Sequence, residues 1–163
     1  MPGQLADLLR NTLATELPQL SALTETAASE MPNGPDAWSP KQELGHLIDS
    51  AANNHLRFVS TSLNSGFSGL PYAQNGWVDL HGYQDKPWTT TVFFWHAYNT
   101  FLADLISRIQ EDDLANTCTI GGSEPCTLRF LIQDYVLHMQ HHIDHLLGRE
   151  HVTPYPPAGT TTT

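Results

Sequence analysis

The amino-acid sequence predicts an all-α fold, a four-helix bundle with a long crossover between its second and third helices. Four separate stretches carry apolar residues at spacings of three and four, the pattern of helices that bury one face. The sole candidate strand pattern is a short ribbon around Cys118 to Ile120. At 163 residues the chain has about the length of one domain, so we expect residues 1–163 to form a single bundle domain.

The first helix is expected from about Gln4 to Ser29. Leucines spaced mostly three or four apart follow this stretch: Leu5, Leu8, Leu9, Leu13, Leu17, Leu20 and Leu23. Pro18 falls inside it and is expected to kink or divide the helix, because proline lacks a backbone N–H. Residues 31–37 include two prolines, an asparagine and a glycine, which predicts a connection.

The second helix is predicted to begin at Ser39 and to reach about Ser60. Ser39 can cap the helix, Pro40 suits its first position, and Gln42 completes a capping box. Residues 64–87 are rich in glycine, proline, asparagine and aromatic side chains and have little helical or alternating pattern. Connections of this length are usually functional or mobile, so we expect this one to act as a lid.

The third helix is expected from about Thr89 to Gln110. The fourth begins after Thr127, a suitable N-cap, and ends near Gly148, because glycine is favoured just beyond a helix C-terminus. The tail 152–163 contains three prolines and ends in threonines. It has too few apolar side chains to form a core, so we expect it to be irregular.

The chain is acidic, with 17 Asp and Glu against 7 Lys and Arg and a formal net charge of −10. Such a surface repels phosphate backbones, so we expect no nucleic-acid partner. No apolar run is long enough to cross a bilayer, and the first residues lack the features of a signal peptide, so we expect no membrane partner and a cytoplasmic location.

The chain has two cysteines, Cys118 and Cys126. They could pair, but in a reducing cytosol they are expected to be free thiols.

Histidine is unusually frequent: there are nine, four of them between residues 138 and 145. His138 and His142 are four residues apart on a helix, so both imidazoles can reach one ion. His141 and His145 have the same spacing. At about 100° per residue, however, they lie toward the edge shared with Asp134, whereas His138 and His142 fall within the inward apolar stripe. A single pair of this kind also arises by chance.

A catalytic metal site usually has three protein ligands, so a third ligand is expected from another helix. His46, beside the apolar stripe of the second helix, is the best candidate; His55 and His96 are weaker. Polar residues on the same side of that helix form a strip that is expected to line a cleft: Asp49, Ser50, Asn53 and Arg57. Asp49 or another residue of the strip is expected to orient a ligand from behind, and Asn53 and Arg57 are expected to hold a substrate. The alternative for Arg57 is a surface salt bridge.

Two segments of the chain carry motifs that recur in a known family. Residues 38–50, Trp-Ser-Pro-Lys-Gln-Glu-Leu-Gly-His-Leu-Ile-Asp-Ser, resemble the start of the second helix in the DinB-like family, where a tryptophan, a capping serine and a histidine followed by Leu-Ile-Asp recur. Residues 137–146, Leu-His-Met-Gln-His-His-Ile-Asp-His-Leu, resemble its last helix, where His-His follows a histidine at three and four residues. The order of the helices and the long crossover also match along the chain.

The resemblance implies an up-down-down-up bundle and one divalent metal ion, nickel or zinc, held by His46, His138 and His142. It also implies a homodimer formed through helix faces. Some relatives are thiol-dependent enzymes, including mycothiol-dependent maleylpyruvate isomerases and bacillithiol or mycothiol S-transferases. The resemblance therefore implies that a low-molecular-weight thiol serves as an additional cofactor and that a small molecule is the substrate.

Three classes of function remain in competition, and the first, a metal-dependent enzyme, includes two reactions. The leading hypothesis is a thiol S-transferase, in which a metal with open positions lowers the pKa of a bound thiol and makes it nucleophilic. A metal-dependent hydrolase would activate water at the same site. The second class is a metal-binding or stress-response protein without catalysis, in which the ion clamps two helices together. A third possibility is a bundle without metal.

Overall fold

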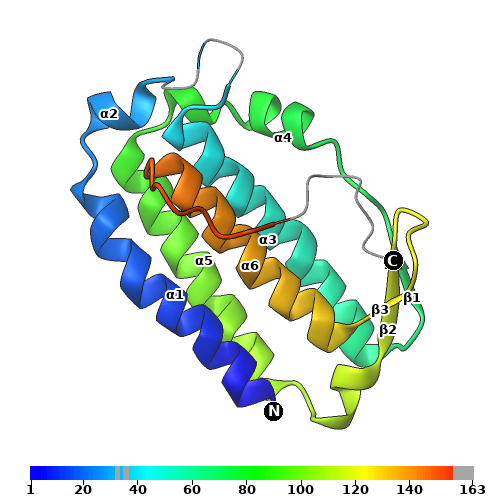
Figure 1. Cartoon of the computed structure of the whole chain (residues 1–163). Helices are drawn as coiled ribbons and strands as arrows, with labels where there is room; N and C mark the ends of the chain where they lie inside the picture. Colours follow the sequence, from blue (N-terminus) through cyan, green and yellow to red (C-terminus); the bar gives the residue numbers. More distant parts are fainter. Residues whose placement is uncertain (32–33, 35–36, 156–163) are drawn as a thin grey trace.

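Four long helices form the protein, as the computed structural model of residues 1–31, 34 and 37–155 shows (Figure 1). They are α1 (Pro2–Ala22), α3 (Pro40–Leu63), α5 (Trp88–Arg108) and α6 (Leu128–Leu146). α1 packs against α5 and α6, and α3 packs against the same two helices, so α1 and α3 occupy opposite corners of the bundle. The predicted four-helix bundle is confirmed. No helix among the described residues has the length and apolar character needed to span a membrane.

The direction of the helices follows from the long crossover. α3 runs down the bundle, and the chain then climbs back along its side, so that α5 starts at the end where α3 starts (Figure 1). α1 and α6 therefore run one way and α3 and α5 the other. This is the predicted up-down-down-up arrangement, and it sets α3 antiparallel to α6.

Local capping sets the starts of α3 and α6 where the sequence predicted them. The Ser39 hydroxyl accepts from the Gln42 backbone N–H, and the Gln42 side chain accepts from the backbone N–H of Ser39 at 3.0 Å. The Thr127 hydroxyl accepts from the backbone N–H of Phe130 at 3.2 Å. Both caps satisfy N–H groups that a helix start leaves without a partner.

The prediction of one helix from Gln4 to Ser29 is wrong, because the helix breaks between Leu23 and Thr24. α1 ends at Ala22, and a short helix, α2 (Glu25–Ser29), begins with Thr24 as its N-cap. The Thr24 hydroxyl accepts from the backbone N–H of Ala27 at 3.2 Å, which stabilises a new helix start. Pro18 lies inside α1 without dividing it.

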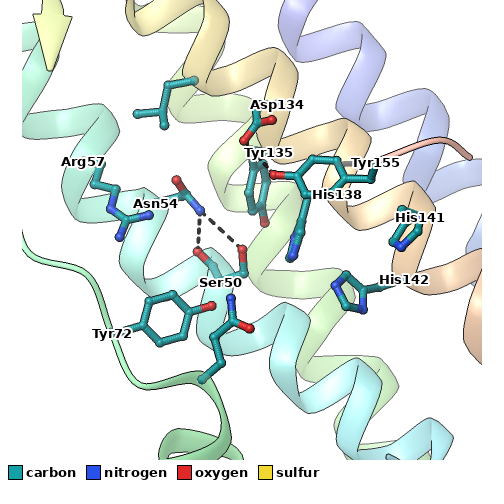
Figure 2. A pocket seen from close by; sticks show the side chains of 12 residues that line it. Ser50, Asn54, Arg57, Tyr72, Asp134, Tyr135, His138, His141, His142 and Tyr155 are labelled. Carbon is teal, nitrogen blue, oxygen red and sulfur yellow. Dashed lines mark hydrogen bonds between the residues drawn. The ribbon is translucent and has the colours of Figure 1, made fainter. Parts of the chain in front are cut away.

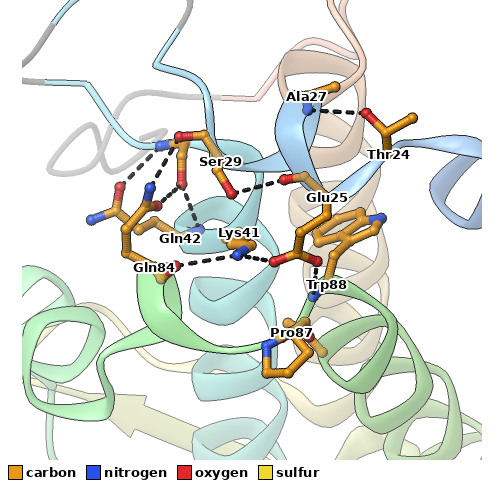
Figure 3. Close-up of polar contacts among 11 residues, drawn as sticks. Thr24, Glu25, Ala27, Ser29, Lys41, Gln42, Gln84, Pro87 and Trp88 are labelled. Carbon is orange, nitrogen blue, oxygen red and sulfur yellow. Dashed lines mark hydrogen bonds and ion pairs between the residues drawn. The ribbon is translucent and has the colours of Figure 1, made fainter.

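A buried lysine joins α2 to α3 and α5 at one end of the bundle (Figure 3). Lys41 is 4% exposed, and its ammonium forms an ion pair with Glu25 and donates to the Gln84 carbonyl oxygen at 3.3 Å. Glu25 also accepts from the backbone N–H of Trp88 at 2.8 Å, and the indole N–H of Trp88 donates to the Leu20 carbonyl at 2.9 Å. A buried ammonium needs such partners, since an isolated buried charge is costly.

The crossover is more ordered than its sequence predicted. It holds a strand, β1 (Phe67–Gly69), a helix, α4 (Gln74–His81), and a 3-10 turn, η1 (Tyr83–Asp85). β1 pairs in parallel with β2 (Thr117–Ile120), which pairs antiparallel with β3 (Cys126–Thr127). The ribbon expected near Cys118 is therefore present, with β1 added from a segment distant in sequence. Pairing of this kind does not show in the local pattern of either segment.

Gly45 allows the crossover to approach α3 closely. A Cβ atom at Gly45 would lie 2.2 Å from ring atoms of Tyr83. The Tyr83 hydroxyl donates to Asp49 Oδ1 at 2.7 Å, so the ring is held against α3 at both ends. This contact fixes the crossover on the helix segment that carries the histidine at position 46.

We predict that Gly45→Ala lowers the free energy of unfolding by about 1–3 kcal/mol, because the new methyl group overlaps the Tyr83 ring. Gly76→Ala is the matched control: it is also helical, and its Cβ would meet nothing closer than Ala73 Cβ at 3.8 Å. That variant should be unchanged or more stable by up to about 1 kcal/mol. Urea unfolding followed by circular dichroism measures both, and equal effects would contradict the proposed contact.

Candidate metal centre

Three histidines meet at the seam between α3 and α6. His46 comes from α3, and His138 and His142 lie one turn apart on α6. One ring nitrogen from each can be chosen so that all three lie within 4.8 Å of one another. The Nε2 atoms of His46 and His138 are 3.2 Å apart. In Figure 2 the rings of His138 and His142 lie on the side of α6 that faces α3.

Burial keeps two of these imidazoles neutral. Burial lowers the pKa of His46 to about 3, with a further contribution from the nearby His142. The pKa of His138 is also well below its usual value, mainly through burial. Two neutral ring nitrogens only 3.2 Å apart repel one another unless a proton or a cation lies between their lone pairs. The buried cluster is therefore suited to a cation.

One distance within the cluster, that between His46 and His138, agrees with metal coordination. In a tetrahedral zinc site with Zn–N bonds of about 2.0–2.1 Å, neighbouring nitrogens are about 3.3 Å apart. The 3.2 Å between His46 and His138 is close to that value. The Nδ1 atom of His46 is buried and has no hydrogen-bond partner within the described part of the chain, while the Trp38 ring packs 5.0 Å from the imidazole.

Glu43 orients His142. Its Oε2 lies 2.6 Å from His142 Nδ1, so this nitrogen carries the proton and Nε2 keeps the lone pair. Glu43 precedes His46 by three residues and therefore shares its side of α3. The sequence interpretation missed this residue and named Asp49 for the role, although the spacing to His46 could have indicated Glu43.

A pocket of about 560 Å³ opens beside the histidines (Figure 2). Its walls come from α3, α6, the crossover and the C-terminal segment: Ser50, Asn54, Arg57, Tyr72, Gln74, Leu131, Asp134, Tyr135, His138, His141, His142 and Tyr155. Tyr72 and Gln74 are the contribution of the crossover, which the sequence predicted to be a lid. Burial raises the pKa of Asp134, whose Oδ2 accepts from the Tyr155 hydroxyl at 3.0 Å.

Arg57 lies in this pocket, as expected of a substrate-binding residue. Its guanidinium donates to the Leu70 carbonyl at 3.1 Å. Among residues 1–31, 34 and 37–155 it forms no ion pair, so the alternative of a surface salt bridge does not hold for the described chain. The guanidinium thus remains available to an anionic group.

The sequence predicted that Asp49 and Asn53 would belong to a polar strip beside the ligands and the substrate. In the structure neither residue lines this pocket. Asn53 donates to the Asp49 carbonyl at 2.9 Å, and Asp49 Oδ1 is bound by His81 and Tyr83. Positions 46, 50, 54 and 57 recur at helical spacing and face α6, whereas 49 and 53 are rotated toward α4. A residue that the sequence interpretation did not name, Asn54, lies in the pocket instead.

The C-terminal segment covers the histidine end of the pocket. His141 Nδ1 contacts the Thr153 carbonyl at 2.6 Å, so His141 is half-buried rather than solvated, while His145 is exposed as expected. The Tyr155 ring lies 5.1 Å from that of His138. The predicted irregular tail is therefore packed on α6 up to residue 155, and the rest of it lies outside the described residues. No sequence pattern indicated a role for Tyr155.

The two weaker histidine candidates lie elsewhere. His55 Nδ1 contacts the Tyr98 hydroxyl at 3.1 Å, and His96 lies beside Trp95 on α5. Neither belongs to the group of histidine nitrogens at the α3–α6 seam.

Comparison with known proteins gives consistent matches. The sequence model of the DinB superfamily matches residues 8–146. A protein of Oceanobacillus iheyensis named "Putative metal-dependent hydrolase" is 20% identical over 151 residues, which cover 88% of this chain and 87% of that protein. A protein of Bacillus mycoides with the same description is 23% identical over 109 residues, 67% of this chain and 62% of its own length.

The fold also matches a solved structure. YfiT from Bacillus subtilis, described as a probable metal-dependent hydrolase with an unusual four-helix bundle topology, superposes with a TM-score of 0.77 at 21% identity. The match covers 91% of this chain and 86% of that protein. At this identity the likeness establishes the arrangement of the helices.

Proposed function

This chain belongs to the DinB superfamily, and from that premise we propose that it is a metal-dependent enzyme that acts on a small molecule in the pocket beside the histidines. The observation that carries the proposal is the meeting of three imidazoles from two helices at one end of that pocket. We propose His46, His138 and His142 as the ligands of one divalent ion, nickel or zinc, since imidazole nitrogen suits both.

The bound ion would act as a Lewis acid and polarise a thiol, a water molecule or a substrate oxygen. The chain supplies the rest of the chemistry. Glu43 fixes the tautomer of His142. Asp134, with its pKa raised by burial, is suited to accept or return a proton within the pocket. Tyr155 and Tyr135 contribute to the wall of the pocket beside Asp134.

We propose that Arg57 binds an anionic group of the substrate. Arg57 and two histidines of the cluster, His138 and His142, line the same pocket. A carboxylate or phosphate paired with Arg57 would orient the rest of the molecule toward the histidines. The substrate class is therefore a small anionic molecule.

Thiol S-transfer is the reaction we place first, because the resemblance to thiol-dependent relatives suggested it and a pocket of about 560 Å³ has room for small reactants. In this reaction a low-molecular-weight thiol is the second cofactor. Hydrolysis is the second candidate, supported by the description of two relatives as metal-dependent hydrolases. A metal that merely clamps α3 to α6 is the alternative to both.

We also propose a cytoplasmic homodimer. Apolar side chains are exposed along α5: Phe93 is 72%, Phe94 51% and Phe101 52% exposed. Apolar groups so exposed favour an interface with a second copy of the chain. The net charge of −10 gives no support to a nucleic-acid partner.

Metal binding is tested first on His138→Ala and Glu43→Gln. We expect His138→Ala to abolish stoichiometric binding and Glu43→Gln to weaken it by roughly 10- to 100-fold, because Glu43 orients a ligand. His145→Ala, which removes an exposed histidine of the same helix, should bind as the unaltered protein does. Elemental analysis and competition with a chromophoric chelator give the values. Unchanged binding by His138→Ala would refute the site.

Catalysis is tested by assaying thiol transfer, with several low-molecular-weight thiols, and ester hydrolysis on anionic substrates. Arg57→Gln should raise KM by roughly 10- to 100-fold with little change in kcat, because charge-assisted hydrogen bonds contribute about 1.5–3 kcal/mol. Arg57→Lys should recover part of the loss. If neither assay detects turnover and His142→Ala unfolds the protein, the result favours the alternative in which the metal only holds α3 and α6 together.

The dimer is tested by Phe101→Glu. A charge on this side chain should convert the dimer to a monomer, since burying an unpaired carboxylate is costly. Phe130→Glu is the control, because Phe130 is 53% exposed but lies on α6. Light scattering coupled to size-exclusion chromatography measures the mass. A dimer that survives Phe101→Glu would place the interface on another face.

A further inference from the structure

The two cysteines of the chain lie side by side in the small sheet. Cys118 of β2 and Cys126 of β3 are partners in the antiparallel register, and their Sγ atoms are 3.7 Å apart. Cys118 is 1% exposed, whereas Cys126 is half-buried. A disulfide bond is about 2.0 Å long, so the sulfurs need to approach by less than about 2 Å to form one.

The backbone already has the geometry of a cross-strand disulfide. Directly opposed residues of antiparallel strands have Cα atoms about 4.5–5.5 Å apart, within the range of about 4.4–6.8 Å that disulfides span. The hairpin between the strands turns through Gly121 and Gly122, both with positive φ. The register of the two strands is therefore compatible with a bond between the two sulfurs.

The surroundings favour the loss of one proton from the pair. The hydrogen bond between the sulfurs lowers the pKa of Cys118, and the positive charge of Arg57 also favours its thiolate, while burial opposes it. The pKa of Cys126 is correspondingly raised, because its thiol donates to Cys118. One shared negative charge on two sulfurs in contact is the arrangement of a reactive dithiol.

We propose that Cys118 and Cys126 form a reversible dithiol–disulfide pair that reacts with low-molecular-weight disulfides. Cys126, the more accessible sulfur, attacks one sulfur of the disulfide while the neighbouring Cys118 thiolate accepts its proton. This step forms a mixed disulfide and releases the first small thiolate. Cys118 then gives its proton to the released small thiolate and attacks Cys126 Sγ, which forms the intramolecular bond and releases the second small thiolate.

The reaction balances without any further reagent. The protein pair loses two electrons and its one remaining proton, and the small disulfide takes up both to become one small thiol and one small thiolate. Excess small thiol reverses the reaction. The inference is independent of the metal, because neither cysteine belongs to the histidine cluster.

The test uses the reduced full-length chain and oxidised glutathione under anaerobic conditions, followed by alkylation with N-ethylmaleimide after denaturation. The chain has two cysteines, so the intact mass identifies the product. We expect a protein that has lost two hydrogens, takes up no maleimide and carries no glutathione, and that dithiothreitol restores. A stable glutathione adduct, a linked dimer or two persistently free thiols would each overturn the proposal.

Single variants identify the attacking sulfur. Cys126→Ser leaves the buried Cys118 alone and should react at roughly a tenth of the unaltered rate or slower, because access limits exchange. Cys118→Ser should instead stop at the mixed disulfide, with glutathione held on Cys126. Circular dichroism confirms that each variant is folded. Equal rates for Cys126→Ser and the unaltered chain would contradict the order of attack.

Discussion

The seam between α3 and α6 is the contact on which the site depends. It brings together histidines 92 residues apart in the sequence and buries them where water cannot solvate a charged imidazole. The two helices must be antiparallel for the second turn of α3 to face the last turns of α6. That direction is set by the crossover, which carries the chain back up the bundle before α5 begins. The geometry of the site is thus a property of the topology.

The crossover gives α3 two different sides. Toward α6, the positions that follow His46 at helical spacing line a polar pocket. Toward α4, Asp49 is held by His81 and Tyr83 and takes part in the packing of the crossover. The close approach at Gly45 fixes the rotation of α3 between these sides. One helix therefore serves both as a wall of the pocket and as the base of the crossover.

Features set by neighbouring residues could be predicted from the sequence, and features set by distant residues could not. The cap at Ser39, the cap at Thr127 and the shared face of His138 and His142 depend on spacings within one helix. The break at Thr24 is a different case, since the short helix after it is held by Glu25, whose partner Lys41 lies beyond a connection.

The same limit explains why the sequence did not identify some of the residues that line the pocket. Asn53 and Asn54 differ by about 100° on the helix, and only the packing of α3 decides which of them faces α6. Tyr155 reaches the pocket through contacts of the C-terminal segment with α6, which no local pattern encodes. The pairing of β1 with β2 likewise joins residues about fifty positions apart.

The position of the C-terminal segment has a practical consequence for preparing the protein. Tyr155 lies against His138, and eight residues follow it in the sequence. At about 3.5 Å per extended residue, a polyhistidine tag fused after them would begin within about 30 Å of Tyr155, near enough to the histidine cluster to compete with it for metal. Met1 lies at the opposite end of the bundle, so an affinity tag placed before it would start far from that cluster (Figure 1).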